Sequence, residues 1–403
     1  MSDVVSSRHS ASQVRTSLAD IVISAEPGFA CGADESEGLL QLRMNNVTVD
    51  GTLDWTDRRR VPAEAGDLDR YGLEPGDIMF NCTNSSDLVG KTALFSGFSE
   101  PVAYSNHFLR LRLNRKQAEP GYVSWWLYRQ WRRREFERLA ICWVNQATVR
   151  KDDLLDIQID LPELPSQRRI AGMLDNADRL RRMRRYALEL SDQYLPALFL
   201  RMFGDIVANP QGLPRAQLCE LAEIQIGNTP PREDADNYGG TVEWIKSDNI
   251  VQGALHPTRA SEMLSAKGAS LGALVDPGAI LVTCIAGSLA SIGNVAVTDR
   301  RVAFNQQLCS LSPHQDVEPL FLYGMMLKAK PLVQRQATEA MKRMVSKGRL
   351  EEVSLFRPIR TQQKAFANAL MLHETSRAAT SEALRQAEHL FQSLLNQYFG
   401  EEN

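Results

Sequence analysis

The sequence predicts two α/β (α+β) domains in tandem duplication, joined by two long antiparallel helices that form a coiled coil. Three observations lead to this prediction. Two stretches far apart in the chain follow the same helical plan, and one of them closes each half. Matching short segments recur in the same order through both halves. Short apolar runs that follow Pro-Gly turns indicate buried strands in each half.

The first predicted helix follows Pro165 and runs from Ser166 to Phe203. Its apolar or small residues recur at alternating steps of three and four, which is the spacing of a coiled-coil seam. The predicted seam positions are Ile170, Met173, Ala177, Leu180, Met183, Ala187, Leu190, Tyr194 and Leu198.

The second predicted helix follows Pro358 and ends at Phe399. One shift of 196 residues carries Pro162 onto Pro358 and Gln167 onto Gln363. Each helix would be roughly 50 to 60 Å long. An amphipathic helix needs a partner to cover its seam, and the nearest candidate is the other copy. The predicted seam positions are Phe366, Ala369, His373, Ser376, Thr380, Ala383, Ala387, Leu390, Leu394 and Tyr398.

The repeat extends well beyond the helices. The matched segments keep their order, and the shift between them drifts slowly without reversing, which is the pattern of a tandem duplication. In chain order they are Leu18–Ile21 with Leu221–Ile224, Leu42–Val47 with Ile245–Ile250, Glu74–Ile78 with Asp276–Ile280, Asn106 with Asn305, Glu119-Pro120 with Glu318-Pro319, and Leu154 with Leu350.

The composition is that of a soluble globular protein with two or three domains: 403 residues, 43% hydrophobic and 24% charged. The Ser-rich N-terminus lacks the apolar core of a signal peptide, and no run is long enough to span a membrane. We therefore expect a cytoplasmic protein with no membrane partner. The net charge of -3 argues against indiscriminate nucleic-acid binding but permits a local basic face.

Sequence signals for catalysis are missing. The six cysteines are far apart, with no CxxC pair or His at ligand spacing, so neither a disulfide framework nor a zinc site is expected. Gly90-Lys91-Thr92 resembles a phosphate-binding loop, but Ser85 stands where that loop needs a glycine. The chain lacks the Asn/Asp-Pro-Pro-aromatic loop of an adenine methyltransferase. We therefore predict a protein that is not an enzyme and needs no cofactor.

Both halves carry a basic helical stretch in the same part of the repeat. Helices are predicted from Tyr122 to Leu139 and from Pro319 to Ala340, and basic residues lie in or just after each. A single charge run is usually a solvated helix face, but two copies favour a shared anionic ligand modestly. Polar loops follow the predicted strands, at Asn81 to Lys91, Gly227 to Asn249 and Ala286 to Asn294.

Several of these segments together resemble a known family. Gly227-Asn228-Thr229-Pro230, Tyr238-Gly239-Gly240, Val242 to Asp248, Ile285 to Ser288 and Asn305-Gln306-Gln307 resemble the target recognition domain of type I restriction-modification specificity subunits. The segment Leu161-Pro162-x-Leu164-Pro165-x-Gln167-Arg168-x-Ile170-Ala171 resembles the start of that family's spacer helix. The first half departs most, because it has Glu26-Pro27-Gly28-Phe29 near the expected Gly-x-Thr-Pro and Asn106-His107 in place of Asn305-Gln306.

The resemblance implies a domain plan and a set of partners. Residues 1–160 would be the first target recognition domain, 161–205 the first spacer helix, 206–355 the second target recognition domain and 356–403 the second spacer helix. Each domain would read one half of a bipartite site on double-stranded DNA. Two methyltransferase subunits, which bind S-adenosylmethionine, would dock on the chain and recruit the restriction and motor subunits.

Asn, Ser, Lys and Arg on loops are side chains that read base edges and clamp phosphates. The candidate DNA-binding residues are Arg43, Asn45, Asn84, Ser85, Lys91, Arg132, Arg133, Arg134, Lys246, Ser247, Asn249, Ser288, Ser291, Lys342, Arg343, Lys347 and Arg349. Two other hypotheses stay open at this point: a recognition module of a related methylation-based defence system, and a protein-interaction scaffold that makes no DNA contact.

Overall fold

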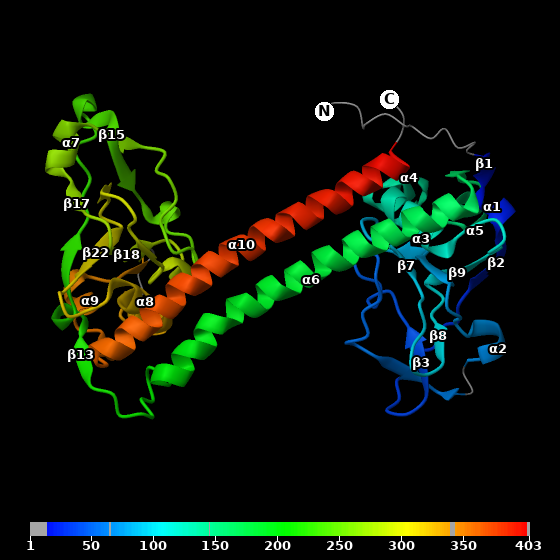
Figure 1. The fold of residues 1–403 in the computed structure, drawn as a ribbon, viewed down its shortest axis with the longest axis horizontal. Helices are drawn as coiled ribbons and strands as arrows, with labels where there is room; N and C mark the ends of the chain where they lie inside the picture. Colours follow the sequence, from blue (N-terminus) through cyan, green and yellow to red (C-terminus); the bar gives the residue numbers. More distant parts are fainter. Residues whose placement is uncertain (1–13, 64–65, 145, 339–342, 401–403) are drawn as a thin grey trace, which may run out of the picture. The chain divides into compact units, whose positions relative to one another are not determined.

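The computed structural model describes residues 14–63, 66–144, 146–338 and 343–400 (Figure 1). The chain forms two compact units. Unit 1 combines the chain up to Met183 with the chain from Leu384 onward, and unit 2 runs from Arg184 to Ala383. Each long helix therefore contributes one part to each unit.

Unit 1 is built on an antiparallel four-stranded sheet. Its strand order is β2 (Val22–Pro27), β9 (Phe108–Leu113), β5 (Ile78–Asn81) and β7 (Thr92–Leu94). All four residues of β5 are buried, as expected for the short apolar run that follows a Pro-Gly turn. Gly76 in that turn has a φ of 99°, which a residue with a side chain rarely adopts.

Three smaller sheets complete the strands of unit 1. In the first, β3 (Leu39–Leu42) lies between β4 (Arg59–Val61) and a parallel partner, β8 (Val102–Tyr104). In the second, β11 (Gln146–Thr148) lies between β10 (Ile141–Trp143) and β6 (Thr83–Asn84). In the third, β1 (Val14–Ser17) pairs with β12 (Gln158–Leu161). The short helices are α1 (Leu18–Ile21), α2 (Leu68–Tyr71), α3 (Pro120–Arg132), α4 (Glu135–Leu139) and α5 (Lys151–Leu155).

Unit 2 repeats this plan with the same order of matching strands. Its four-stranded antiparallel sheet is β14 (Ala222–Ile226), β22 (Leu308–Pro313), β18 (Ile280–Thr283) and β20 (Val295–Val297). Its second sheet is β16 (Met263–Leu264), β15 (Tyr238–Ile245), β21 (Val302–Phe304) and β17 (Ala273–Val275), in which β15 and β21 are parallel. The strand pairs are β19 (Ile285–Ala286) with β23 (Arg343–Met344) and β13 (Arg215–Gln217) with β24 (Ser354–Phe356).

The helices of unit 2 include three α-helices and four short 3-10 turns among the described residues. The α-helices are α7 (Ala266–Leu271), α8 (Pro319–Arg335) and α9 (Lys347–Glu351). The 3-10 turns are η2 (Leu218–Glu220), η3 (Ala235–Asn237), η4 (Ser247–Asn249) and η5 (Leu289–Ser291). Together the two units confirm the predicted tandem α/β duplication.

One predicted helix is two helices in the structure. The stretch from Tyr122 to Leu139 is divided between α3 and α4, because Arg134 has a φ of 62° and interrupts the helical backbone. The predicted end of the matching helix at Ala340 lies outside the described residues, and α8 ends at Arg335.

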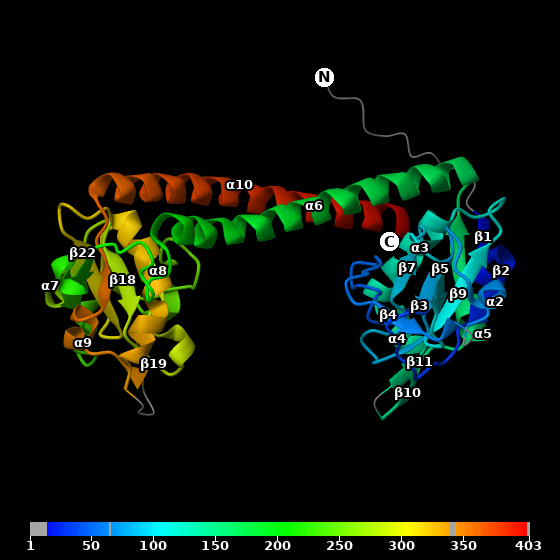
Figure 2. The same cartoon turned by 90° about the horizontal axis from the view of Figure 1, so that it is seen from below.

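The long helices are α6 (Leu164–Phe203) and α10 (Arg360–Phe399), of 40 residues each. In unit 1 the last turns of α10 bring Phe391, Leu395 and Phe399 into the core that also holds Ile170 and Leu174 of α6. In unit 2 the end of α6 and the start of α10 share a core in the same way: Phe199 and Phe203 contact Phe366. The segments therefore pack antiparallel in each unit, as predicted (Figures 1 and 2).

The predicted seam of α6 is wrong over its middle part. Met183, Leu190 and Tyr194 are 63%, 48% and 49% exposed. Asp178 and Arg181 are buried instead, at 2% and 4% exposed. A buried ion pair therefore takes seam positions one residue away from the apolar pattern, which a search for apolar periodicity cannot detect.

Candidate nucleic-acid interface

Polar side chains meet in unit 2 where two parallel strands end. Residues Trp244 and Ile245 of β15 lie beside Ala303 and Phe304 of β21. Because the carboxyl ends of parallel strands meet at one edge of a sheet, the following loops are neighbours. These loops carry Lys246-Ser247 and Asn305-Gln306-Gln307.

Gln307 lies at the centre of this edge. Its side-chain oxygen accepts hydrogen bonds from Ser247 Oγ at 3.0 Å and from Asn305 Nδ2 at 2.9 Å. Its backbone oxygen accepts from the amides of Cys284 and Ile285 at 2.8 and 3.0 Å. The end of β18 and the start of β19 are thereby fixed against the same loop. We call the cluster of Ser247, Asn305, Gln306 and Gln307 the unit 2 junction.

Other predicted residues lie close to the unit 2 junction in the topology. Arg343 on β23 pairs with Ala286 on β19. The preceding residue of β19, Ile285, donates its amide to the Gln307 carbonyl. Ser288 is exposed and caps η5 by accepting from the Ala290 amide at 3.2 Å, and Ser291 ends that turn. Ser247 and, through the pairing of β23 with β19, Arg343 are thus joined to this edge of unit 2, whereas Lys342 lies outside the described residues.

Unit 1 has the same edge with different side chains. Leu42 of β3 lies beside Tyr104 of the parallel strand β8, and the Ser105 amide donates to the Leu42 carbonyl at 3.0 Å. The backbone oxygen of His107 accepts from Asn81 Nδ2 at 3.0 Å and from the Thr83 amide at 3.3 Å. His107 therefore takes the place of Gln307, and Asn106, His107, Asn84 and Ser85 form the unit 1 junction.

A polar cavity of about 370 Å³ opens beside β3 in unit 1. Arg43 and Asn45, both predicted from the sequence, line it together with Arg58 and Arg59. Asn45 Nδ2 donates to a carboxylate oxygen of Asp57 in the same wall at 2.7 Å. The lining also includes Asp34, so three guanidinium groups and two carboxylates leave a small positive charge that suits a phosphate or the acceptor edge of a base.

Two of the predicted contact residues are buried and hold their own loops. Lys91 is 6% exposed, and its ammonium group donates to the Met44 and Val47 carbonyls at 3.2 and 2.5 Å. Burial lowers the pKa of this ammonium group. Asn249, 9% exposed, accepts from the Lys246 amide at 3.0 Å and donates to the Arg259 carbonyl at 3.1 Å. Both side chains are therefore occupied by backbone groups and are not part of the interface.

Lys246 is only partly available to a ligand. Its ammonium nitrogen lies 2.6 Å from a carboxylate oxygen of Glu262 and 4.9 Å from the centre of the Trp244 ring. The hydrogen bond from Lys246 lowers the pKa of the Glu262 carboxyl group. Arg232 lies 2.9 Å from the same carboxylate, and its side chain is 54% exposed. A phosphate could therefore bind Lys246 or Arg232 only after that cation had left Glu262.

The predicted basic runs are partly neutralised by neighbouring carboxylates. Arg133 and Arg134 lie 3.8 and 3.3 Å from Glu135 and Glu137. In unit 2, Lys347 lies 3.6 Å from Glu351. The remaining predicted cations, Arg132 and Arg349, are exposed, and Arg349 also donates to the Gln336 carbonyl at 3.0 Å. Such surface ion pairs contribute little stability, so a phosphate can displace them.

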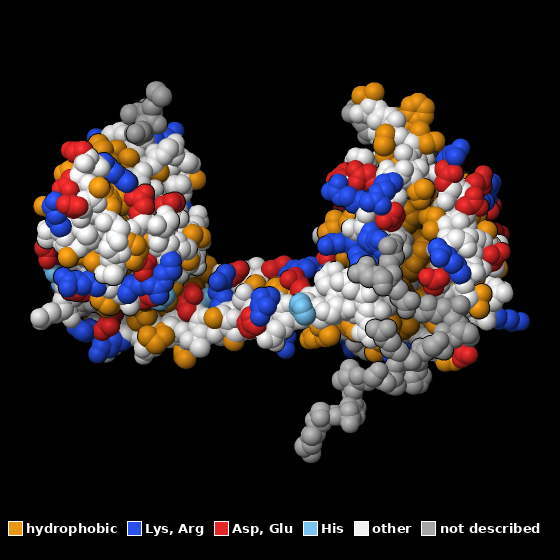
Figure 3. Space-filling model, turned by 90° about the horizontal axis from the view of Figure 1, so that it is seen from above, with side chains coloured by type: hydrophobic (Ala, Val, Ile, Leu, Met, Phe, Trp, Pro, Cys, Tyr) orange, Lys and Arg blue, Asp and Glu red, His pale blue; other side chains and the backbone are white. Residues whose placement is uncertain are grey.

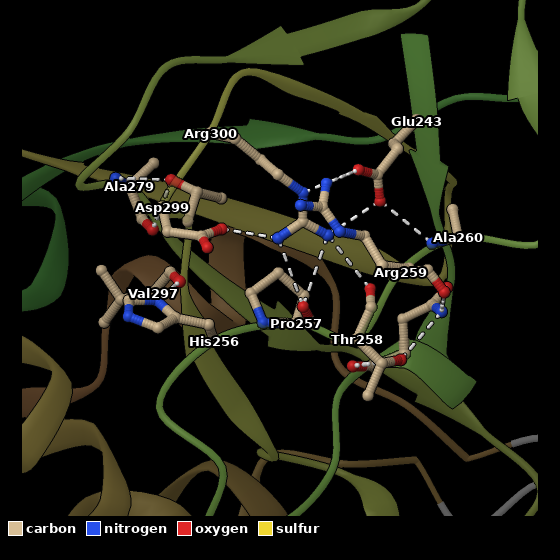
Figure 4. A network of polar contacts seen from close by, with 12 residues as sticks. Glu243, His256, Pro257, Thr258, Arg259, Ala260, Ala279, Val297, Asp299 and Arg300 are labelled. Atoms are coloured by element: carbon tan, nitrogen blue, oxygen red, sulfur yellow. Dashed lines mark hydrogen bonds and ion pairs between the residues drawn. The ribbon is translucent and has the colours of Figure 1, made fainter. Parts of the chain in front are cut away.

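A network around Glu243 fixes the strand that leads to the unit 2 junction (Figure 4). Arg300 donates to both carboxylate oxygens of Glu243 at 2.8 Å, and the Ala260 amide donates at 3.0 Å. Arg259 adds a contact of 2.5 Å. The hydrogen bonds from Arg300 lower the pKa of Glu243 to about 2. This carboxylate therefore stays charged and joins β15 to the loop before β16.

The described residues contain no group of three or more His, Cys, Asp and Glu side chains suited to a metal ion. Across the part of the chain that the structure describes, no helix combines the length and the apolar character needed to cross a bilayer. The junction residues Asn106, His107, Gln306 and Gln307 were not among the predicted contacts. The structure matches Ser105 to Asn305 and Asn106 to Gln306, because the Ser105 and Asn305 amides donate to the equivalent carbonyls of Leu42 and Ile245, so the sequence pairing of Asn106 with Asn305 was one residue out of register.

Known type I specificity subunits are similar in sequence to this chain. Residues 215–386 match the type I restriction modification DNA specificity domain. The chain is 23% identical over 319 residues to a putative type I restriction enzyme MjaX specificity subunit of Methanocaldococcus jannaschii, which covers 75% of this chain and 73% of that protein. It is also 30% identical over 116 residues to the HindI specificity subunit of Haemophilus influenzae, over 28% of this chain and 24% of that protein.

Solved structures agree in fold over nearly the whole chain. The type I restriction-modification S subunit from M. genitalium matches with a TM-score of 0.66 at 12% identity, over 99% of each chain. A chain from a study of complex assembly and conformational transition of the type I R-M system matches with a TM-score of 0.53 at 18% identity, over 96% of this chain and 97% of that one. Residues 215–386 thus resemble a type I restriction modification DNA specificity domain, and nearly the whole chain shares the fold of a type I restriction-modification S subunit.

Proposed function

We propose that this chain reads a bipartite DNA site for a type I restriction-modification complex, with unit 1 on one half-site and unit 2 on the other. The observation that carries the proposal is the pair of junctions. Both units place polar side chains after the ends of a parallel strand pair, on backbones joined by equivalent hydrogen bonds.

The junctions differ in the side chains that they present. Gln306 and Gln307 are exposed and partly exposed in unit 2, and Asn106 and His107 have the same exposure classes in unit 1. Asn and Gln amides can bind adenine through two hydrogen bonds, whereas His offers one donor and one acceptor. The two units share the backbone arrangement but present different side chains, which supports two recognition surfaces that read different sequences.

In this proposal the chain performs no chemistry. Two methyltransferase subunits that bind S-adenosylmethionine would dock on it and act on the DNA that it selects, and restriction and motor subunits would join through them. The duplicated scaffold supports this stoichiometry, because two similar units offer two similar docking surfaces to two copies of one partner. The basic groups at Arg43, Arg132 and Arg343 would contact phosphates and position the duplex.

Mapping of methylated adenines tests the proposal. Cells with and without this protein, each with its methyltransferase, should differ by one bipartite methylated sequence. Exchange of residues 206–355 for the matching segment of another family member should alter one half of that sequence only. Changes in both halves would contradict independent reading by the two units.

A DNA-free scaffold makes a different prediction. It requires that the purified chain with its methyltransferase shows no sequence preference at any salt concentration. The DNA-reading proposal expects specific binding in that assay, with an affinity that falls as salt rises because phosphate contacts release counterions.

A further inference from the structure

The hairpin of β10 and β11 in unit 1 presents apolar side chains to solvent. Trp143 is 71% exposed, Val144 98% and Ile141 43%. Trp143 is also the tryptophan with the highest exposure among the described residues, since Trp125, Trp126 and Trp244 are buried. Large apolar side chains at a protruding tip cost free energy in water unless a ligand covers them.

The hairpin is joined to the unit 1 junction. Ala147 and Thr148 of β11 pair with Asn84 and Thr83 of β6. The Thr83 amide also donates a hydrogen bond to the His107 carbonyl. β10 is the free edge of this three-stranded sheet. In Figure 2 the hairpin projects from the end of unit 1 that is farthest from α6. Its apolar tip therefore continues the surface that the proposed function assigns to DNA.

Shape favours DNA over a protein partner. A two-stranded ribbon fits a DNA groove. A stable protein interface buries about 800 Å² on each side around a packed apolar centre, far more than one narrow tip provides. Figure 3 shows hydrophobic side chains at this end of unit 1 and a mixed group of basic and acidic side chains below them on the same unit.

Charge near the tip is consistent with that choice. The side chains of Arg134, just before α4, and Arg138, on α4, are 72% and 71% exposed, although each pairs with a glutamate of α4. Exposed pairs of this kind contribute at most about 1 kcal/mol, so phosphates can replace the glutamates.

We propose that Trp143 and Val144 form a wedge that enters a groove of the bound duplex and packs between base pairs in the half-site of unit 1. This inference rests on the proposed function and adds a mode of contact to it. Apolar wedges of this kind partly unstack a base step and kink the duplex. A wedge also reduces the cost of extruding a base for methylation by a partner enzyme.

The matching sheet of unit 2 is described only in part. Met344 on β23 is 42% exposed and occupies the strand that matches β11. The unit 2 residues that would match Trp143 and Val144 lie outside the described residues, so the wedge is assigned to unit 1 alone.

The test uses the full chain with its methyltransferase and duplexes that carry the mapped site, with 2-aminopurine placed at successive positions. Wild type should raise the 2-aminopurine fluorescence at one step in one half-site, and its own tryptophan emission should be quenched. Trp143→Ala should abolish the rise and weaken binding by roughly 5- to 150-fold, the range for loss of one aromatic stacking contact. Trp143→Phe should retain most of the affinity.

Tyr186→Ala is the matched control, because Tyr186 is a comparably exposed aromatic residue, at 62%, on α6. Wild-type affinity and fluorescence in Trp143→Ala, with sequence preference intact, would overturn the wedge and leave the proposed function standing. Loss of the methyltransferase from Trp143→Ala without loss of DNA affinity would overturn it in favour of a protein contact. A wild-type complex without any sequence preference would contradict the proposed function, and the wedge with it.

Discussion

The side-chain oxygen of Gln167 accepts a hydrogen bond from the backbone amide of Glu119 at 2.8 Å. The same contact recurs in unit 2, where Gln363 accepts from the Glu318 amide at 3.0 Å. Each glutamine also donates to the carbonyl of a proline five residues earlier. These buried amides join the start of each long helix to the helix that begins after Glu119 or Glu318.

Removal of either glutamine should destabilise the protein. We expect Gln167→Ala and Gln363→Ala each to lower the free energy of unfolding by roughly 1 to 3 kcal/mol, because a buried backbone amide loses its acceptor. Urea unfolding of each variant measures this. The exposed neighbour Lys364→Ala is the control and should be near wild type. Equal stability of Gln363→Ala and Lys364→Ala would show that the contact is unimportant.

The buried pair of Arg181 and Asp178 predicts a larger effect. Arg181 lies 2.6 Å from Asp178, and its guanidinium carbon lies 4.2 Å from the centre of the Phe391 ring on α10. Arg181→Ala removes one of the two cations of the buried Asp178, whose other partner is Arg182 at 2.7 Å, and it also removes the partner of Asp50, so we expect a loss of about 3 kcal/mol. Arg179→Ala, an exposed arginine on the same helix, should cost far less. Thermal and urea unfolding that failed to separate the two variants would contradict this assignment.

Glu243 predicts a pH dependence. Its folded pKa of about 2 lies below the ordinary value of 4.5, so its contribution is complete above about pH 4.5 and is lost as the pH falls toward 2. Glu243→Gln should be less stable by roughly 1.5 to 3 kcal/mol at neutral pH. The difference from wild type should shrink as the pH falls below about 4.5. Unfolding curves at several pH values test this, and a difference that is constant with pH would exclude a role for the charge.

The junctions predict which half-site each unit reads. In the proposed function, Gln306→Ala with Gln307→Ala should relax discrimination at one or two base pairs of one half-site, and Asn106→Ala with His107→Ala should do so in the other. Each lost base contact should reduce discrimination by about 1 to 3 kcal/mol. Competition binding with duplexes mutated at single positions measures it. A uniform weakening across all positions would mean that these side chains contact only the backbone.

The basic run of unit 1 predicts an effect on salt dependence instead. The triple variant Arg132→Ala, Arg133→Ala and Arg134→Ala should weaken binding to all sequences alike. The slope of log affinity against log salt should fall by roughly one for each lost phosphate contact. Because Arg133 and Arg134 already pair with glutamates, we expect a change of fewer than three. An unchanged slope would show that these arginines face solvent and do not contact phosphates.

The sequence by itself determined the architecture, because repeats and turn residues are local signals. Gly76 and Gly278 both have positive φ after a proline and precede fully buried strands, as the Pro-Gly pattern predicted. The alignment of Gln167 with Gln363 required no structure. Neighbouring residues alone specify the Pro-Gly turns, and the repeat itself aligns the two glutamines.

Only the tertiary structure decided which polar residues face solvent. Lys91 and Asn249 belong to loops of the expected type, yet their side chains turn inward and donate to backbone carbonyl groups. The α6 seam is displaced because Asp178 and Arg181 neutralise each other in the core. The junctions and the Trp143 tip arise from strand pairing between distant segments, and a linear sequence contains no direct record of those pairings.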